Sequence, residues 1–204
     1  MMWKPSREAY PEHHEIVDWH LHGKPSSWSE PDFEWPKFAW IQAKLQEVCP
    51  PPKQLLDVGC FTGYLLRRLA ERGYRGVGID LQRDLMVASE QLARLGRTPL
   101  SFRFCGAESC DGVFPAGCFD AVLALDVLEH TLDERRALDS LRTVCQPGGW
   151  LFFHLPQEDH DSAEHVRDYG PADLQALAAQ LVEGRVEEGV DELGRRTAWV
   201  YGRN

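Results

Sequence analysis

The sequence predicts an α/β fold in which an open, mostly parallel sheet carries helices on both faces. From about residue 54 onward, short apolar segments alternate with segments of helical periodicity, which is typical of parallel strands joined by crossover helices. A loop with glycines at positions 59 and 63 links the first strand to the first of these helices. The last two strands are joined by a short polar link that contains Gly194, which predicts a hairpin and an antiparallel final strand.

Seven strands and their helices follow in order. The run of branched apolar residues 55–58 predicts a buried strand, and helical spacing resumes at Tyr64 and continues to about Gly73. The further predicted strands are residues 76–80, 100–105, 119–125, 150–155, 186–190 and 197–201, and the further helices are 85–95, 132–144 and 171–181. Gly96 is expected to end the helix at residues 85–95. The turn at residues 147–149 is expected to lead into the fifth strand, which Pro156 ends.

The first 50 residues differ from the rest of the chain. They contain five tryptophans, four histidines and several prolines, with little periodicity before Phe33. Apolar residues at positions 38, 41, 45 and 48 predict one amphipathic helix, which the prolines at 50–52 end. We therefore divide the chain into an N-terminal helical and irregular cap, residues 1–50, and a main domain, residues 51–204.

The length and the net charge of the chain exclude some classes of function. A chain of 204 residues accommodates one domain with a substantial core, and 43% hydrophobic and 26% charged residues are ordinary for a globular protein. The formal net charge of -10 argues against nucleic acid as the partner, because proteins that bind it usually present a basic face.

The cysteines and the apolar runs predict a cytoplasmic protein. The six cysteines form no C-x-x-C pair, so we expect free thiols in a reducing compartment. The N-terminus has no apolar signal-peptide core, and no run is long enough to span a bilayer, so we expect no membrane partner.

The glycine loop and the acid at position 80 indicate a ligand site. A loop of this kind brings backbone close to a ligand and directs helix N–H groups at it. Asp80 ends the second strand 23 positions after Asp57, near the offset at which an acid binds ribose hydroxyls in nucleotide-binding units. The alternatives are an ordinary tight turn for the loop and a helix cap or loop acid for Asp80.

Taken together, these features resemble the class I S-adenosylmethionine-dependent methyltransferases, which have a Rossmann-like doubly wound sheet. The resemblance covers about residues 54–204 and rests on the order of its motifs: residues 55–63, Asp80, residues 105–108, residues 119–130 and the turn at 147–149. The D-V-L-E-H run at 126–130 is similar to the branch that methylates small molecules, including quinone precursors and sugars.

The resemblance implies S-adenosylmethionine as the cofactor. Its methionine half would meet Asp57, Gly59 and Gly63, its ribose Asp80, and its adenine Leu81 and Ala107, with Glu108 as an acceptor for the exocyclic amine. The full predicted pocket comprises Asp57, Gly59, Cys60, Phe61, Gly63, Asp80, Leu81, Ala107, Glu108, Asp126 and Val127. Phe61 departs from the glycine that the family commonly has, and it would be strained if the backbone there needs positive φ. We interpret it as a change in pocket shape, with weakened cofactor binding as the alternative.

The acceptor is expected beside the end of the fourth strand and the loop after the fifth. His130 and His165 are the candidate catalytic bases, and Glu129, His154, Arg167 and Tyr169 the candidate substrate-binding residues. Each of these residues also has a possible structural role. His130 could cap a helix, His154 could be a core histidine, and His165 could be a surface residue. Arg167 could pair with Asp168 or Glu164. No H-E-x-x-H or comparable spacing appears, so we expect no metal.

The sequence thus predicts a methyltransferase that acts on a small-molecule acceptor at oxygen by in-line transfer, as a monomer or homodimer. The alternative is a regulatory or structural protein that binds the cofactor without turnover.

Overall fold

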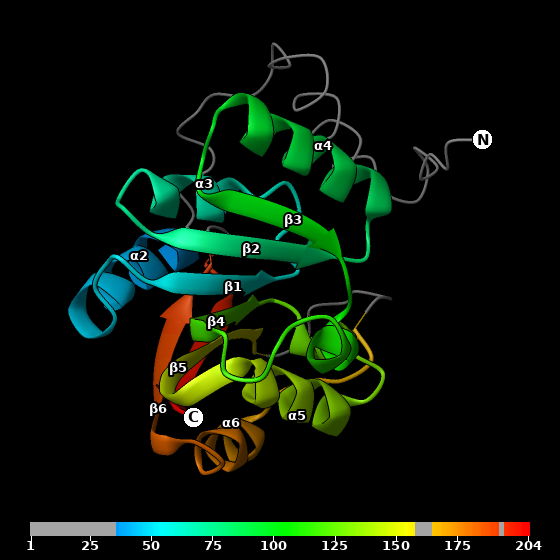
Figure 1. The fold of residues 1–204 in the computed structure, drawn as a ribbon. Coiled ribbons are helices and arrows are strands. Elements are labelled where there is room, and N and C mark those ends of the chain that lie inside the picture. The colour runs from blue at the N-terminus through cyan, green and yellow to red at the C-terminus, as the bar shows by residue number, and fades with distance from the viewer. Residues whose placement is uncertain (1–35, 158–164, 192–193) are drawn as a thin grey trace.

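The computed structural model describes residues 36–157, 165–191 and 194–204 (Figure 1). The predicted cap before residue 36, with four of its tryptophans and all four of its histidines, lies outside the described residues. So does the part of the acceptor loop at residues 158–164.

A seven-stranded sheet forms the centre of the molecule, with the strand order β3-β2-β1-β4-β5-β7-β6. Its strands are β1 (Gln54–Val58), β2 (Arg75–Asp80), β3 (Leu100–Phe104), β4 (Phe119–Leu125), β5 (Cys145–Pro156), β6 (Val182–Val190) and β7 (Arg196–Arg203). The first five strands pair in parallel, whereas β7 is antiparallel to both β5 and β6. The predicted α/β fold, its seven strands and its antiparallel last strand are confirmed.

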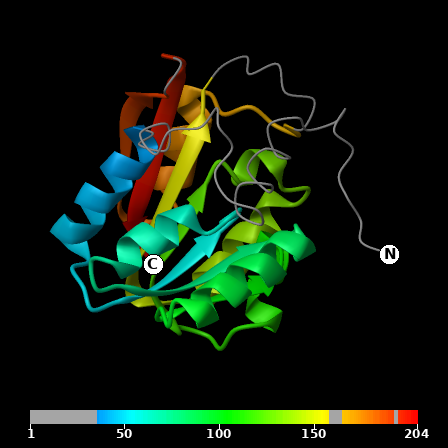
Figure 2. The ribbon, with the colours of Figure 1, turned by 90° about the horizontal axis from the view of Figure 1, so that it is seen from above.

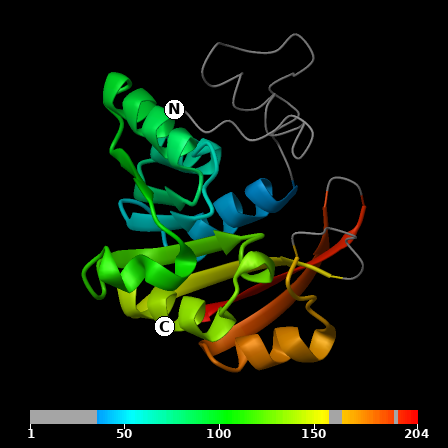
Figure 3. The same cartoon turned by 90° about the vertical axis from the view of Figure 1, so that its right-hand side faces the viewer.

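Helices cover both faces of this sheet (Figures 2 and 3). They are α2 (Pro36–Val48), α3 (Tyr64–Ala70), α4 (Arg83–Leu95), α5 (Glu134–Val144) and α6 (Pro171–Ala178), with short 3-10 turns η2 (Ala107–Gly112) and η3 (Leu128–His130). Apolar residues of α2, α3 and α4 form one core cluster, and those of α5, α6 and η2 form the other. Within the described ranges, no helix is both long and apolar enough to cross a membrane.

The central strands are apolar along their whole length because both of their faces are buried. In β1, Leu55 belongs to the cluster under α2 and α3, while Leu56 and Val58 belong to the cluster under α5. Ile41 and Leu45 of α2 are fully buried in the same cluster as Leu55. This helix, which we assigned to the cap, therefore packs directly on the sheet.

Several predicted boundaries were wrong by a few residues, and β6 begins at Val182 instead of residue 186. Strand β5 begins at Cys145 instead of Trp150, because Cys145 pairs with Phe119 before a register shift in β4. Helix α5 begins at Glu134, where the Asp133 carboxylate accepts a 2.9 Å hydrogen bond from the Arg136 N–H and caps the helix. Helix α6 ends at Ala178 rather than near residue 181.

Candidate active site

The loop between β1 and α3 takes a left-handed conformation at three alternate residues. Its φ angles are 66° at Gly59, 49° at Phe61 and 71° at Gly63. A Cβ at Gly59 would lie 2.7 Å from a methyl group of Val127, and one at Gly63 would lie 2.3 Å from the Phe102 ring. Both positions therefore require glycine. Phe61 also has a positive φ, which is the condition under which the sequence analysis expected it to be strained.

Neighbouring elements hold this loop in place. The Thr62 carbonyl accepts hydrogen bonds from Arg67 of α3 at 2.7 Å and from the hydroxyl of Ser89 of α4 at 3.2 Å. Cys60 is buried, and its thiol contacts the Met86 sulfur at 3.8 Å. The loop is thus a fixed surface at the carboxyl ends of the strands, where ligands bind in open α/β sheets.

Asp80 lies at the end of β2, beside the loop. Its Oδ2 accepts from the Phe61 N–H and its Oδ1 from the Gln82 N–H, both at 2.9 Å. It therefore has the role of a loop acid, which was the alternative to ribose binding. A carboxylate has about four acceptor positions, so these two bonds do not by themselves exclude a ligand hydroxyl.

Asp57 and Asp80 place two carboxyl groups under the loop. Asp57 is only 4% exposed, and burial first, then the nearby charge of Asp80, raises its pKa to about 8. A cationic ligand at this place would reduce that electrostatic cost.

Residues from β2 and η2 meet on the other side of Asp80. A Cβ built on Gly106 would lie 3.2 Å from Leu81 Cδ2 and 3.5 Å from a carboxylate oxygen of Glu108. Ala107 is buried, whereas the Leu81 side chain is 67% exposed beside them. The structure thus brings together the three residues predicted to surround an adenine.

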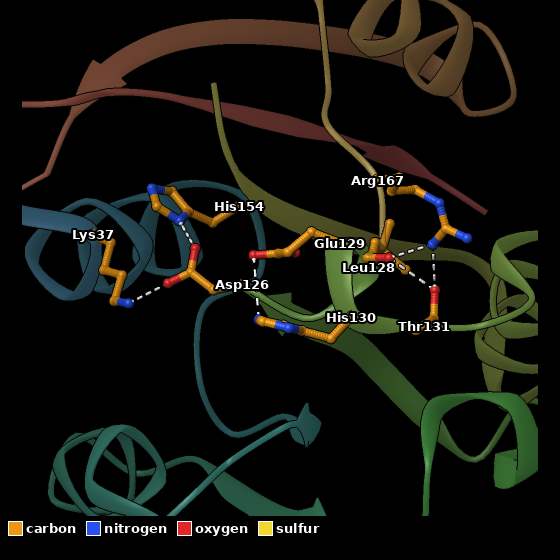
Figure 4. Close-up of polar contacts among 8 residues, drawn as sticks. All are labelled: Lys37, Asp126, Leu128, Glu129, His130, Thr131, His154 and Arg167. Atoms are coloured by element: carbon orange, nitrogen blue, oxygen red, sulfur yellow. Dashed lines mark hydrogen bonds and ion pairs between the residues drawn. The ribbon is translucent and has the colours of Figure 1, made fainter. Parts of the chain in front are cut away.

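Asp126 links three distant parts of the chain (Figure 4). One carboxylate oxygen accepts from Lys37 of α2 and the other from Nδ1 of His154 on β5. Burial disfavours the carboxylate anion, but the His154 hydrogen bond and the Lys37 charge outweigh this effect and hold the Asp126 pKa below its usual range. His154 is 3% exposed, as expected of a core histidine. The sequence analysis missed Lys37, because 89 residues separate it from Asp126 and it belongs to no motif.

Glu129 lies on η3 with a side chain that is 1% exposed. Neither carboxylate oxygen has a hydrogen-bond partner among the described residues, and burial first, then the charge of Asp126, raises its pKa to about 8. His130 Nε2 lies 4.0 Å from Glu129 Oε1, and the His130 and His165 rings meet edge to face with centroids 4.9 Å apart. The structure therefore joins both predicted bases to Glu129. Asp133, not His130, caps α5.

Arg167 and Tyr169 have structural partners. The Arg167 guanidinium donates to the Leu128 carbonyl at 2.6 Å and to the Thr131 hydroxyl at 2.9 Å. Tyr169 is buried in the core, and its hydroxyl donates to Glu134 at 2.6 Å. These contacts give both residues a role in holding the loop after β5. Their predicted contact with a substrate stays a prediction.

The family model described as a methyltransferase domain matches residues 37–186, which is most of the chain. The chain belongs to the methyltransferase domain family. Membership confirms the resemblance to class I S-adenosylmethionine-dependent methyltransferases, whose cofactor is S-adenosylmethionine.

The relatives of this methyltransferase include enzymes of quinone biosynthesis. A ubiquinone biosynthesis O-methyltransferase from Chromobacterium violaceum is 35% identical over 101 residues, which are 50% of this chain and 43% of that protein. The chain thus matches less than half the length of this relative.

Solved structures confirm the fold. The PH0226 protein from Pyrococcus horikoshii has a TM-score of 0.70 at 16% identity, over 98% of this chain and 100% of that chain. The 1,6-didemethyltoxoflavin-N1-methyltransferase from Burkholderia thailandensis has a TM-score of 0.66 at 18% identity, over 100% and 92%. At these identities the likeness concerns the fold alone.

Proposed function

We propose that this chain binds S-adenosylmethionine along the carboxyl ends of β1, β2 and β3 and methylates an oxygen of a small-molecule acceptor. The observation that carries the proposal is the left-handed loop of residues 59–63, fastened to Asp80 and flanked by Leu81 and Glu108. The family match includes all of these residues.

The residues present fit this cofactor. Gly59 and Gly63 leave the loop without side chains where the methionine half would lie, and the Asp80 carboxylate at the end of β2 would accept hydrogen bonds from the ribose hydroxyls. A ligand that carries a sulfonium and an ammonium group would favour the ionised form of Asp57, whose pKa is raised in the unliganded fold by burial and by the charge of Asp80. When bound, S-adenosylmethionine supplies a methyl group already activated by its positive sulfur.

The side chains that follow Asp126 and Val127 in the chain, together with the loop after β5, act on the acceptor. An acceptor hydroxyl loses its proton as its oxygen forms the new bond to carbon, and His130 or His165 would take that proton. Glu129, buried beside both histidines, would orient them or the acceptor. Arg167 holds residues 165–169 against η3, beside these side chains.

A hydroxylated ring is the acceptor class that we favour. The support is the similarity to ubiquinone biosynthesis O-methyltransferases, whose printed names state methylation at oxygen. Exposed apolar side chains near the histidines, Leu132 at 86% and Val166 at 52%, suit such a ring better than a sugar. The free thiols of the six cysteines support a cytoplasmic setting as part of the same proposal.

Calorimetry and a methylation assay test the proposal in sequence. S-adenosylhomocysteine should bind to the purified chain with one site, and a panel of phenols, catechols and sugars should then yield an O-methylated product by mass spectrometry. Absence of any binding heat at high protein concentration would overturn the cofactor assignment. Binding without methylation of any panel member would favour the regulatory alternative, which the relatives reported above do not support.

A further inference from the structure

Cys105 and Cys110 bring two thiols together just after the end of β3. Both side chains are buried, at 5% and 0% exposed, in the core cluster under α5 and α6. Their sulfur atoms contact the same oxygen, the carbonyl of Gly106, at 3.3 Å and 3.5 Å. The Cys110 thiol also donates a hydrogen bond to the Cys105 sulfur. The two sulfur atoms are therefore neighbours in the reduced protein.

The chain turns back on itself between the two cysteines. The Ser109 N–H donates to the Gly106 carbonyl at 3.1 Å, which closes a turn over residues 106–109. A turn of this kind holds its first and fourth Cα atoms within about 7 Å, so the residues that flank it lie close together. A disulfide requires Cα atoms about 4.4–6.8 Å apart. The fold thus presents the two cysteines in an arrangement that a disulfide can close.

The hydrogen bond between the thiols makes them chemically unequal. It stabilises the Cys105 thiolate and lowers the pKa of Cys105 from its ordinary value, although burial opposes this effect. The same hydrogen bond, together with burial, raises the pKa of Cys110. Because the thiolate is the form that attacks an oxidant, Cys105 has the character of an attacking thiol and Cys110 that of a resolving thiol.

The residues between the cysteines are those predicted to surround the adenine, and both ends of the segment are fastened. The Cys105 N–H donates to the Asp80 carbonyl at 3.2 Å. At the other end, the Asp111 N–H donates to the Ser140 hydroxyl of α5 at 3.1 Å. A change in the separation of the two sulfur atoms must therefore be absorbed by residues 106–109.

We propose that Cys105 and Cys110 form a reversible disulfide on reaction with a hydroperoxide, and that this bridge weakens binding of the cofactor. The second part rests on the proposed function and deepens it. The Cys105 thiolate attacks one peroxide oxygen and the O–O bond breaks, which gives a sulfenic acid and an alkoxide or hydroxide that takes a proton from solvent. The Cys110 sulfur then bonds to the Cys105 sulfur, and the sulfenic oxygen leaves with the thiol proton as water.

The bridge changes the wall of the adenine site. It removes both thiol protons, so the Gly106 carbonyl loses two hydrogen-bond donors. The S–S bond of about 2.05 Å is also much shorter than a contact between two thiols, so the ends of the turn are drawn together. Ala107 and Glu108 move with the turn, and the site fits the adenine less well. Two electrons from a dithiol reductant restore both thiols and reverse the change.

Mass spectrometry on the full chain tests the bridge. Protein that has been reduced with dithiothreitol and freed of the reductant is treated with hydrogen peroxide. Its mass should fall by about 2 Da, the two hydrogens of the thiols, and should return on reduction. Trypsin releases residues 104–135 as one peptide with Cys105, Cys110 and Cys118, and fragmentation should place the link between the first two. A link to Cys118, or added oxygen without any link, would overturn the proposal.

Serine variants assign the two roles. Cys110→Ser keeps the size of the side chain and a donor for the Gly106 carbonyl, and it should abolish the link and leave Cys105 with added oxygen. Cys105→Ser should abolish both, and it remains informative if the fully buried position does not tolerate serine. Cys118→Ser, which changes a half-buried thiol of the same peptide, is the matched control and should form the link as the wild type does. An undiminished loss of mass in Cys105→Ser and Cys110→Ser would refute the pairing.

Calorimetry with S-adenosylhomocysteine tests the consequence. Oxidation of the wild type should weaken binding roughly five- to tenfold, about the value of one hydrogen bond, and dithiothreitol should restore it. Peroxide-treated Cys105→Ser should keep the affinity that it has when reduced. Equal affinity of the bridged and the reduced wild type would overturn the second part. If the reduced wild type does not bind S-adenosylhomocysteine, the proposed function and the second part fall together, whereas the mass measurement still decides the bridge.

Discussion

The Phe61 N–H donates a 2.9 Å hydrogen bond to Oδ2 of Asp80, so the loop after β1 is fastened to the end of β2. This bond holds Phe61 at φ 49°, a region that costs a residue with a Cβ about 1–2 kcal/mol. The loop geometry thus depends on an acid that is also the predicted ribose ligand. The first two predictions concern this pair.

Replacing Phe61 with Gly and with Ala should separate strain from packing. Both changes remove the ring, but only glycine adopts φ 49° without cost, so Phe61→Gly should be more stable than Phe61→Ala by about 1 kcal/mol. In ordinary strand or helix interiors the order is reversed. Urea unfolding of the two variants measures the difference, and an alanine variant at least as stable as the glycine variant would contradict it.

Asp80→Ala should weaken binding of S-adenosylhomocysteine by roughly 1–3 kcal/mol, because ligand hydroxyls and the Phe61 N–H lose a charged acceptor. Calorimetry measures the affinity. Asp84→Ala, which removes an exposed acid from the first turn of α4, is the control and should bind normally. Unchanged affinity in Asp80→Ala would remove this residue from the cofactor site.

Asp57 should make the unliganded protein less stable as the pH rises. Its pKa is 3.8 ordinarily and about 8 in the fold, so between these values the folded state holds a proton that the unfolded state has lost. The free energy of unfolding therefore falls between about pH 4 and pH 8, by at most a few kcal/mol. Asp57→Asn should flatten this dependence in urea unfolding at pH 5 and pH 8. An equal loss in wild type and variant would show that other groups cause it.

Lys37→Met should disturb the site through Asp126. The variant removes the Lys37 cation from the Asp126 carboxylate and keeps its hydrogen bond with His154, and we expect a loss of about 1–2 kcal/mol in unfolding free energy together with reduced methyl transfer. Lys53→Met breaks a more exposed ion pair, with Asp120 at 2.9 Å, and should cost less than about 1 kcal/mol without affecting transfer. If both variants retain full transfer, Lys37 has no role beyond stability.

Local patterns explain why so much of the fold could be predicted. The apolar run of β1, the glycines at 59 and 63 and the acid at 80 each impose a conformation through neighbouring residues alone. The boundary of β5 was missed because its first residues pair with Phe119 across a register shift, which leaves no trace in the local sequence of residues 145–149.

The sequence predicted the site residues that belong to motifs. It did not predict the contacts that these residues make with distant parts of the chain. Asp80, Leu81 and Glu108 follow strand ends, so parallel pairing of β1, β2 and β3 brings them together. Arg167 was predicted to bind a substrate or to pair with Asp168 or Glu164. The local sequence did not indicate that its guanidinium donates to the carbonyl of Leu128, a partner 39 residues away.

The sequence by itself determined the sheet, the glycine loop and the family, because periodicity, turn residues and motif order act over short stretches of chain. Only the tertiary structure decided which charges meet. It placed Lys37 on Asp126 and His165 beside Glu129, pairs separated by 89 and 36 positions. Electrostatic and proton-transfer chemistry depends on distances of a few ångströms in space, and strand pairing and loop packing set these distances irrespective of separation along the chain.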